Sequence, residues 1–99
     1  MINHIVLFKL KPFSADEKVE ILNELKFKIE ELNNVISKLV SLEVGLNHES
    51  FPGNYDLALI ARFDSFENLD AYQSHPAHQK VLTRIKEVIE AREAVDFEY

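Results

Sequence analysis

The chain of 99 residues contains no cysteine and no tryptophan, and only two glycines and three prolines. Without cysteine it can form no disulfide, iron–sulfur cluster or zinc finger, and no thiol nucleophile. Basic residues are also few: 11 Lys and Arg stand against 17 Asp and Glu, a formal net charge of −6. Because these cations are scattered, the sequence argues against binding to nucleic acid or to an anionic membrane.

Long hydrophobic runs are missing too, although 46% of the residues are hydrophobic. No stretch approaches the roughly 20 apolar residues of a membrane span. The N-terminus lacks the basic region and cleavage site of a secretory signal. We therefore expect one soluble, cytoplasmic domain over residues 1–99, with no membrane partner.

Four segments show the period of two that is typical of β-strands. They cover residues 2–10, 39–47, 55–63 and a short segment at 95–99. The first is apolar on both faces, with Ile2, His4, Val6, Phe8 and Leu10 on one side and Ile5 and Leu7 on the other.

Helical patterns separate these strands. Ser14 and Glu17 fit a capping box that opens a helix running to about residue 34. Its apolar stripe comprises Val19, Leu22, Leu25, Ile29 and Leu32. A short helix follows to about Tyr72, capped by Asp64 or Ser65, where Asp64 and Glu67 fit a second capping box.

Pro76 begins another helix, since proline suits the first helical position. Its stripe comprises Val81, Leu82, Ile85, Val88 and Ile89. The order is therefore β-α-β-β-α-β, with the second helix broken in two. This order predicts an α+β, ferredoxin-like fold with a four-stranded antiparallel sheet.

The second face of the predicted sheet is unusually apolar. Helices cover only one face of such a sheet, yet Ile5, Leu7, Ala58 and Ile60 fall on the other. At about 25 cal/mol per Å², leaving these side chains in water costs several kcal/mol. We expect a second copy to pack on this face through a two-fold contact. The alternative is a monomer with a partly apolar open face.

Histidine and tyrosine are the candidate catalytic residues. Pro76 places His78 in the first helical turn, near Tyr72 at the end of the preceding helix. Imidazole titrates near neutral pH and a phenol can donate to an oxyanion, so the two could form an acid–base pair. The helix N-terminus should lower the pKa of His78. Alternatively, His78 only ties the two helices together.

The other histidines give weaker signals. His4 lies in an apolar strand, where we expect a neighbouring carbonyl or hydroxyl to satisfy it. His48 lies in a loop and should be solvated. His75 and His78 could suggest a metal, but Pro76 puts His75 outside the helix and no third ligand is evident. We predict no metal and no cofactor, because phosphate loops and nucleophile motifs are also absent.

Several segments together resemble a known family. They are His4-Ile5-Val6-Leu7-Phe8-Lys9, Val44-Gly45-Leu46-Asn47, Tyr55-Asp56, Phe63-Asp64-Ser65 with Leu69 and Tyr72, His75-Pro76-Ala77-His78 and Val95-Asp96-Phe97. Over essentially its whole length the chain resembles the stress-responsive α/β-barrel (Dabb) domain of the dimeric α/β-barrel group. The resemblance implies a homodimer whose sheets face each other, forming a dimeric α/β barrel, and a small cavity in each protomer between sheet and helices.

The resemblance also implies cavity residues. His4, Val6 and Phe8 would point inward, with Phe27, Leu57 and Leu59 as further binding residues. The chain is distantly similar to the plant olivetolic acid cyclase, which implies that Tyr72 and His78 match its catalytic pair and His4 a pocket histidine. Leu57 and Phe27 stand where that enzyme has another histidine and tyrosine, which would make this cavity more apolar.

We therefore expect a stress-related dimer whose cavity binds a small carbonyl or aromatic compound. His78 would be the general base, and Tyr72 would orient it and stabilise an enolate-like oxygen. Two alternatives stay open. One is a non-catalytic dimer in which Tyr72, His75 and His78 only fasten helix ends. The other is a heme- or quinone-handling monooxygenase, as in related dimeric barrels.

Overall fold

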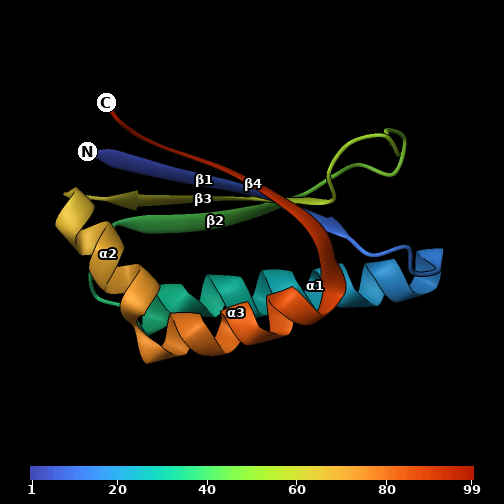
Figure 1. The fold of residues 1–99 in the computed structure, drawn as a ribbon, viewed down its shortest axis with the longest axis horizontal. Coiled ribbons are helices and arrows are strands. Elements are labelled where there is room, and N and C mark those ends of the chain that lie inside the picture. The colour runs from blue at the N-terminus through green and yellow to red at the C-terminus, as the bar shows by residue number, and fades with distance from the viewer.

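The computed structural model describes all of residues 1–99 and contains four strands and three α-helices (Figure 1). In chain order the elements are β1 (Ile2–Leu10), α1 (Ala15–Glu30), the 3₁₀ turn η1 (Glu31–Asn34), β2 (Ser41–Leu46), β3 (Leu57–Phe63), α2 (Phe66–Ser74), α3 (Pro76–Val88) and β4 (Ile89–Glu98). The predicted order and the break in the second helix are confirmed.

The four strands form one antiparallel sheet in the order β2-β3-β1-β4. All three helices lie on one side of this sheet, and the other side is open (Figure 1). This is the ferredoxin-like arrangement that the sequence predicts. None of the helices combines the length and hydropathy needed to cross a bilayer.

Side chains on β1 and β3 alternate between the helical side and the open side. The helix-facing residues of β1 are buried, as are Leu57, Leu59, Ala61 and Phe63 of β3. From α1, Leu25 and Ile29 complete this core. The predicted stripe of α1 is wrong at Val19, which is 60% exposed. The first turns of α1 extend beyond α3, so no second helix covers them (Figure 1).

The helix starts are set by local hydrogen bonds. Ser14 and Glu17 form both bonds of the predicted capping box. At α2 the cap is Ser65, whose hydroxyl accepts from the Asn68 amide. The predicted capping box of Asp64 and Glu67 is therefore wrong, because the helix begins one residue later than that box requires.

Strand β4 differs most from expectation. It begins at Ile89, directly after α3, and is ten residues long rather than a short segment from residue 95. Ile89 is thus the first residue of a strand and not part of the helical stripe. In the β1–β4 ladder, His4 lies opposite Asp96 and Phe8 lies opposite Arg92. Since opposite residues share a face, both β4 residues lie on the helical side of the sheet.

The open face of the sheet remains apolar. Ile5 pairs with Val95, and Leu7 lies one step along the same face. In the single chain Val95 is 53% exposed, Phe97 40% and Leu7 37%. A contiguous patch of this kind is typical of a surface that another protein covers.

Candidate functional site

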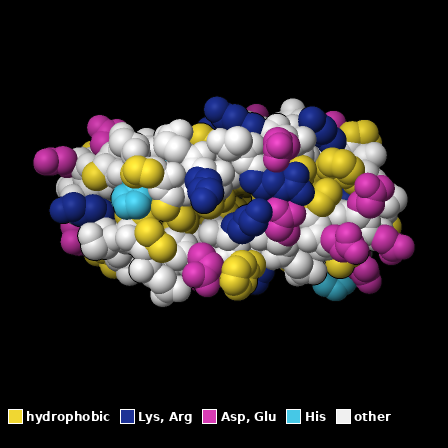
Figure 2. All heavy atoms as spheres, turned by 90° about the horizontal axis from the view of Figure 1, so that it is seen from below, with side chains coloured by type: hydrophobic (Ala, Val, Ile, Leu, Met, Phe, Trp, Pro, Cys, Tyr) yellow, Lys and Arg dark blue, Asp and Glu magenta, His cyan; other side chains and the backbone are white.

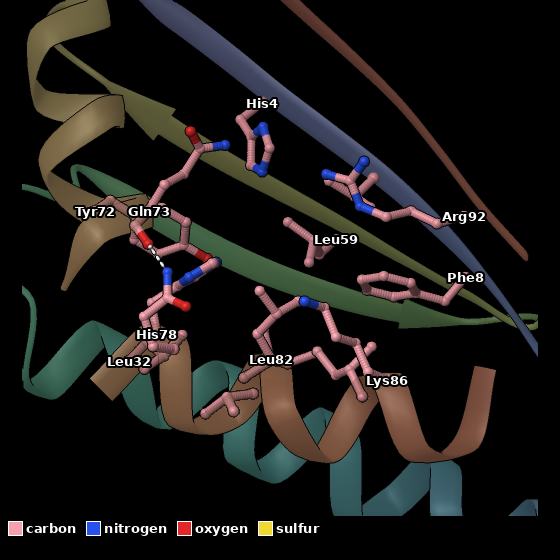
Figure 3. Close-up of a pocket in the computed structure, with 15 residues that line it drawn as sticks. His4, Phe8, Leu32, Leu59, Tyr72, Gln73, His78, Leu82, Lys86 and Arg92 are labelled. Carbon is pink, nitrogen blue, oxygen red and sulfur yellow. Dashed lines mark hydrogen bonds between the residues drawn. The ribbon is translucent and has the colours of Figure 1, made fainter. Parts of the chain in front are cut away.

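A cavity of about 320 Å³ lies between the sheet and the helices (Figure 3). Its wall is mostly apolar, with polar side chains from α2, α3, β1 and β4. The apolar residues are Val6, Phe8, Ile29, Leu32, Leu59, Val81, Leu82 and Ile85, and the others are His4, Tyr72, Gln73, His78, Gln79, Lys86 and Arg92. A small apolar pocket with a few polar groups is the usual form of a ligand site.

Six of the eight residues proposed for the site line this cavity: His4, Val6, Phe8, Leu59, Tyr72 and His78. Leu57 is buried in the core but lies outside the cavity wall.

Phe27 is placed elsewhere. Its side chain is 67% exposed on the outer surface of α1. There it lines a shallow groove between α1 and α3 with Val35, Lys28, Lys80 and Arg84. Figure 2 shows this helical side, where apolar side chains lie among basic ones near the middle of the face. The residue therefore faces solvent, because α1 turns its Leu25 and Ile29 side toward the sheet.

Tyr72 and His78 come together at the break between α2 and α3. Their ring centroids are 4.5 Å apart, with planes inclined by 60°. Phe63 also packs against Tyr72, with ring centroids 5.1 Å apart. His75 holds the break in place, because its Nδ1 accepts a hydrogen bond from the Ala77 amide as the N-cap of α3.

His78 is half-buried, and its Nδ1 atom is buried without a hydrogen-bond partner. Burial lowers the pKa of His78, and hydrogen bonding to the main chain of Gln73 acts in the opposite direction. The imidazole is therefore neutral near pH 7, which leaves a nitrogen free to accept a proton.

Tyr72 has the opposite character. Its side chain is only 1% exposed, and this burial raises the pKa of its phenol to about 12. The hydroxyl thus keeps its proton at neutral pH and can donate it in a hydrogen bond to a ligand oxygen.

His4 is held by a carboxylate. Its Nδ1 lies 2.5 Å from Oδ1 of Asp96, and its ring meets Tyr72 edge-on at 6.2 Å. The prediction that a carbonyl or hydroxyl group satisfies His4 is wrong, because β4 brings the carboxylate of Asp96 opposite His4. An ionised carboxylate only accepts, so Nδ1 donates, and in the neutral ring Nε2 is then left as an acceptor.

The model of the Stress Responsive A/B Barrel Domain (Dabb) matches residues 2–99. The chain belongs to this family. Two solved structures of dimeric ferredoxin-like proteins of unknown function are similar to the Dabb chain. The Bacteroides fragilis protein is 37% identical, with a TM-score of 0.90, over 99% of this chain and 95% of its own. The Thermobifida fusca protein is 31% identical, with a TM-score of 0.83, over 99% and 90%.

A more distant neighbour is the hydroxynitrile lyase of Passiflora edulis. It is 12% identical, with a TM-score of 0.78, and the match covers 97% of this chain and 90% of that one. This likeness shows a shared fold alone. No curated protein matches the Dabb chain by sequence.

Sequence reasoning missed Asp96, Gln73, Gln79, Lys86 and Arg92 as site residues of the Dabb chain. The period of two along a strand indicated the position of one of them. Asp96 alternates with the apolar Val95 and Phe97, so its side chain lies on the opposite face of the sheet from theirs. Only the register with β1 identifies His4 as its partner. No cluster of three or more side chains suited to a metal ion forms in the structure.

Proposed function

We propose that this Dabb protein binds a small carbonyl or aromatic compound in the cavity and transfers a proton at the carbon next to the carbonyl. The observation that carries the proposal is the buried, unpartnered Nδ1 of His78 beside Tyr72, on the wall of an apolar cavity. A buried polar atom without a partner costs free energy, so a position of this kind suits a ligand that supplies the missing contact.

The two side chains would act in complementary ways. His78, neutral at pH 7, would accept the proton from the carbon, and the carbonyl oxygen would gain negative charge as an enolate. Tyr72 would donate a hydrogen bond to that oxygen, because its high pKa keeps the phenol protonated. The low polarity of the cavity strengthens this bond relative to water.

His4 would orient the ligand. With Asp96 holding Nδ1, the ring cannot rotate freely, and Nε2 would accept a hydrogen bond from a hydroxyl of the ligand. Such a fixed ring restricts the poses of the ligand and lowers the entropic cost of reaching the reactive one.

We further propose that the protein acts as a homodimer through the open face of its sheet. The exposed Leu7, Val95 and Phe97 support this arrangement, and so do the related structures described as dimeric. Packing the two faces together would remove the apolar patch from water. The cavity lies on the helical side, so each protomer would keep its own site. A cytoplasmic location and a role in stress stay predictions.

The test is exchange of the methyl hydrogens of acetophenone for deuterium, followed by proton NMR in heavy water. The wild-type protein should raise the exchange rate by at least about 100-fold over buffer, as positioned acid–base groups do. His78→Ala should reduce the rate to that of buffer. Tyr72→Phe should lower it by at least about tenfold while leaving it above the buffer rate, because only the oxyanion donor is lost.

The non-catalytic alternative gives a different result. If His78 only fastened the helix ends, His78→Ala would lower the melting temperature by several degrees, consistent with the loss of roughly 1–2 kcal/mol. Under our proposal this variant still binds acetophenone but loses the exchange activity. Because His78→Ala also removes packing on Tyr72 and hydrogen bonding to Gln73, the exchange rate and not the melting temperature decides between the two roles. Wild-type exchange no faster than buffer, at acetophenone concentrations that shift the NMR signals of Phe8 and Leu59, would disprove the catalytic role.

A further inference from the structure

Two cations of the cavity wall lack an acidic partner. Arg62 pairs with Glu43, and Arg84 pairs with Glu24 and Glu87. Arg92 is the remaining arginine, and no carboxylate lies within ion-pair distance of it.

Lys86 of α3 also lacks an acidic partner, because its ammonium group forms no ion pair and donates no hydrogen bond. The chain has 17 acidic residues against 11 basic ones, so partners are plentiful elsewhere on the surface. Lys9, Lys11, Lys18, Lys38 and Lys80 also form no ion pair, so what distinguishes Arg92 and Lys86 is their place on the cavity wall.

The cavity wall itself contains no acidic residue. Fifteen residues line it, and none of the 17 Asp and Glu residues is among them. Asp96 is not among these wall residues, and its Oδ1 accepts a hydrogen bond from Nδ1 of His4. An anion in the cavity would thus meet two cations and no neighbouring carboxylate on the wall.

The two cations come from different elements, and both are exposed residues that line the cavity where it opens to solvent. Arg92 shares the face of Phe8, because the two residues are opposite each other in the β1–β4 ladder. Figure 3 shows its guanidinium extending toward His4, while the ammonium of Lys86 rises from α3 toward the sheet. In this view both charged groups lie between Phe8 and the Tyr72–His78 pair.

We propose that the ligand of this cavity is a small keto acid with an apolar ring or chain, whose carboxylate is bound by Arg92 and Lys86 and whose ketone reaches the Tyr72–His78 pair. This inference rests on the proposed function and specifies its substrate class. A guanidinium presents paired N–H groups that match the two oxygens of a carboxylate, and a lysine adds a second positive charge. Phe8, Leu59 and Leu82 would contact the apolar part.

The size of the cavity limits the ligand. At roughly 30 Å³ for each water-sized unit, 320 Å³ holds about ten non-hydrogen atoms. A monocyclic aromatic acid meets this limit, with its carboxylate at the cations and its ring against the apolar wall. Because the chain carries a net charge of −6, only such local cations can make an anion favourable here.

The test compares benzoate with benzamide, which has nearly the same shape but no charge. Binding is measured by calorimetry on the full chain at low ionic strength. Wild-type protein should bind benzoate at least about tenfold more tightly than benzamide. Arg92→Gln and Lys86→Gln should each weaken benzoate binding and leave benzamide binding unchanged, and Arg92→Lys should retain part of the preference.

Lys80→Gln is the matched control. Lys80 lies on the same helix as Lys86 and is exposed, but it lines the outer groove and not the cavity. The control changes the net charge equally, so it separates a contact in the cavity from general attraction. It should bind benzoate as the wild type does.

The outcomes distinguish the two proposals. Equal binding of benzoate and benzamide would overturn the carboxylate assignment and leave a cavity that binds neutral compounds. An equal loss of benzoate affinity in Lys80→Gln would also overturn it. Failure of both probes to bind would overturn the carboxylate assignment, and the acetophenone exchange would then decide the proposed function separately. Selective benzoate binding without any acetophenone exchange would uphold the carboxylate site and disprove the catalytic role.

Discussion

Asp96 accepts a hydrogen bond from Nδ1 of His4 across 92 positions of sequence. The contact joins the first and last strands of the sheet and supports a ring on the cavity wall. His4 is 3% exposed on the cavity wall, while the Asp96 side chain is 38% exposed and so partly open to solvent.

Replacing Asp96 with alanine should leave Nδ1 of His4 buried without its partner. We expect a loss of about 1 kcal/mol in unfolding free energy, less than for a fully buried charged bond because Asp96 is partly exposed. This corresponds to a fall of about 4–8 °C in melting temperature for a domain of this size. Calorimetry measures it. Glu98→Ala on the same strand is the control, and an equal fall in that variant would contradict the prediction.

The protonation of His78 should depend on its burial. NMR titration of the imidazole should give a pKa below the ordinary value of 6.5. Since the unfolded chain then binds more protons in this range, stability should fall as the pH drops through about 6.5 toward the folded value. Denaturant unfolding at about pH 7.5 and about pH 5.5 tests this sign. A measured pKa at or above 6.5 would refute the prediction.

Glu24 should make stability sensitive to acid. It accepts two hydrogen bonds from Arg84 of α3 and one from Lys28. Arg84 first, and then Lys28, lowers the pKa of Glu24 to about 2. The ionised Glu24 carboxylate therefore contributes its full share to the unfolding free energy above about pH 4.5, and this contribution is lost as the pH falls toward about 2.

Glu24→Gln checks this dependence. Near neutral pH the variant should be less stable by roughly 0.5–1 kcal/mol, a small effect because the side chains are partly exposed. The difference from wild type should shrink as the pH falls toward about 2, since the wild-type carboxylate is then protonated. Urea unfolding over this range measures both proteins. A difference that stayed constant with pH would rule out the ion pair as its source.

Val95→Glu should dissociate the proposed dimer. Val95 pairs with Ile5 on the open face of the sheet and is 53% exposed in the single chain. A buried charge at this contact costs several kcal/mol, which exceeds what the interface can absorb. Sedimentation in dilute buffer should give a dimer mass for the wild type and a monomer mass for the variant.

Val19→Glu is the matched control, because Val19 is 60% exposed on α1, away from the sheet. Its mass should equal that of the wild type. A monomer mass for the wild-type chain itself would refute the dimer, and the apolar face would then be open to solvent.

Local signals in the sequence determined most of the fold. The alternation in residues 2–10 and 57–63 places side chains on two faces because a strand has a period of two. Ser14 and Glu17 specify a helix start through bonds only three residues apart. Tyr72 and His78 were predicted to meet because Pro76 forces a break between them, and the two rings do pack together.

Contacts between distant elements were decided only by the tertiary structure. Helical spacing does not say how far a neighbouring helix extends, so Val19 was placed inward although it is exposed. Phe27 was expected in the cavity from the family resemblance alone, and it is exposed as well. Asp96 and Arg92 joined the site only through the register of β4 against β1. Periodicity and capping act within a few residues, whereas strand pairing and helix rotation depend on the packing of the whole chain, and these decide which charges face the cavity.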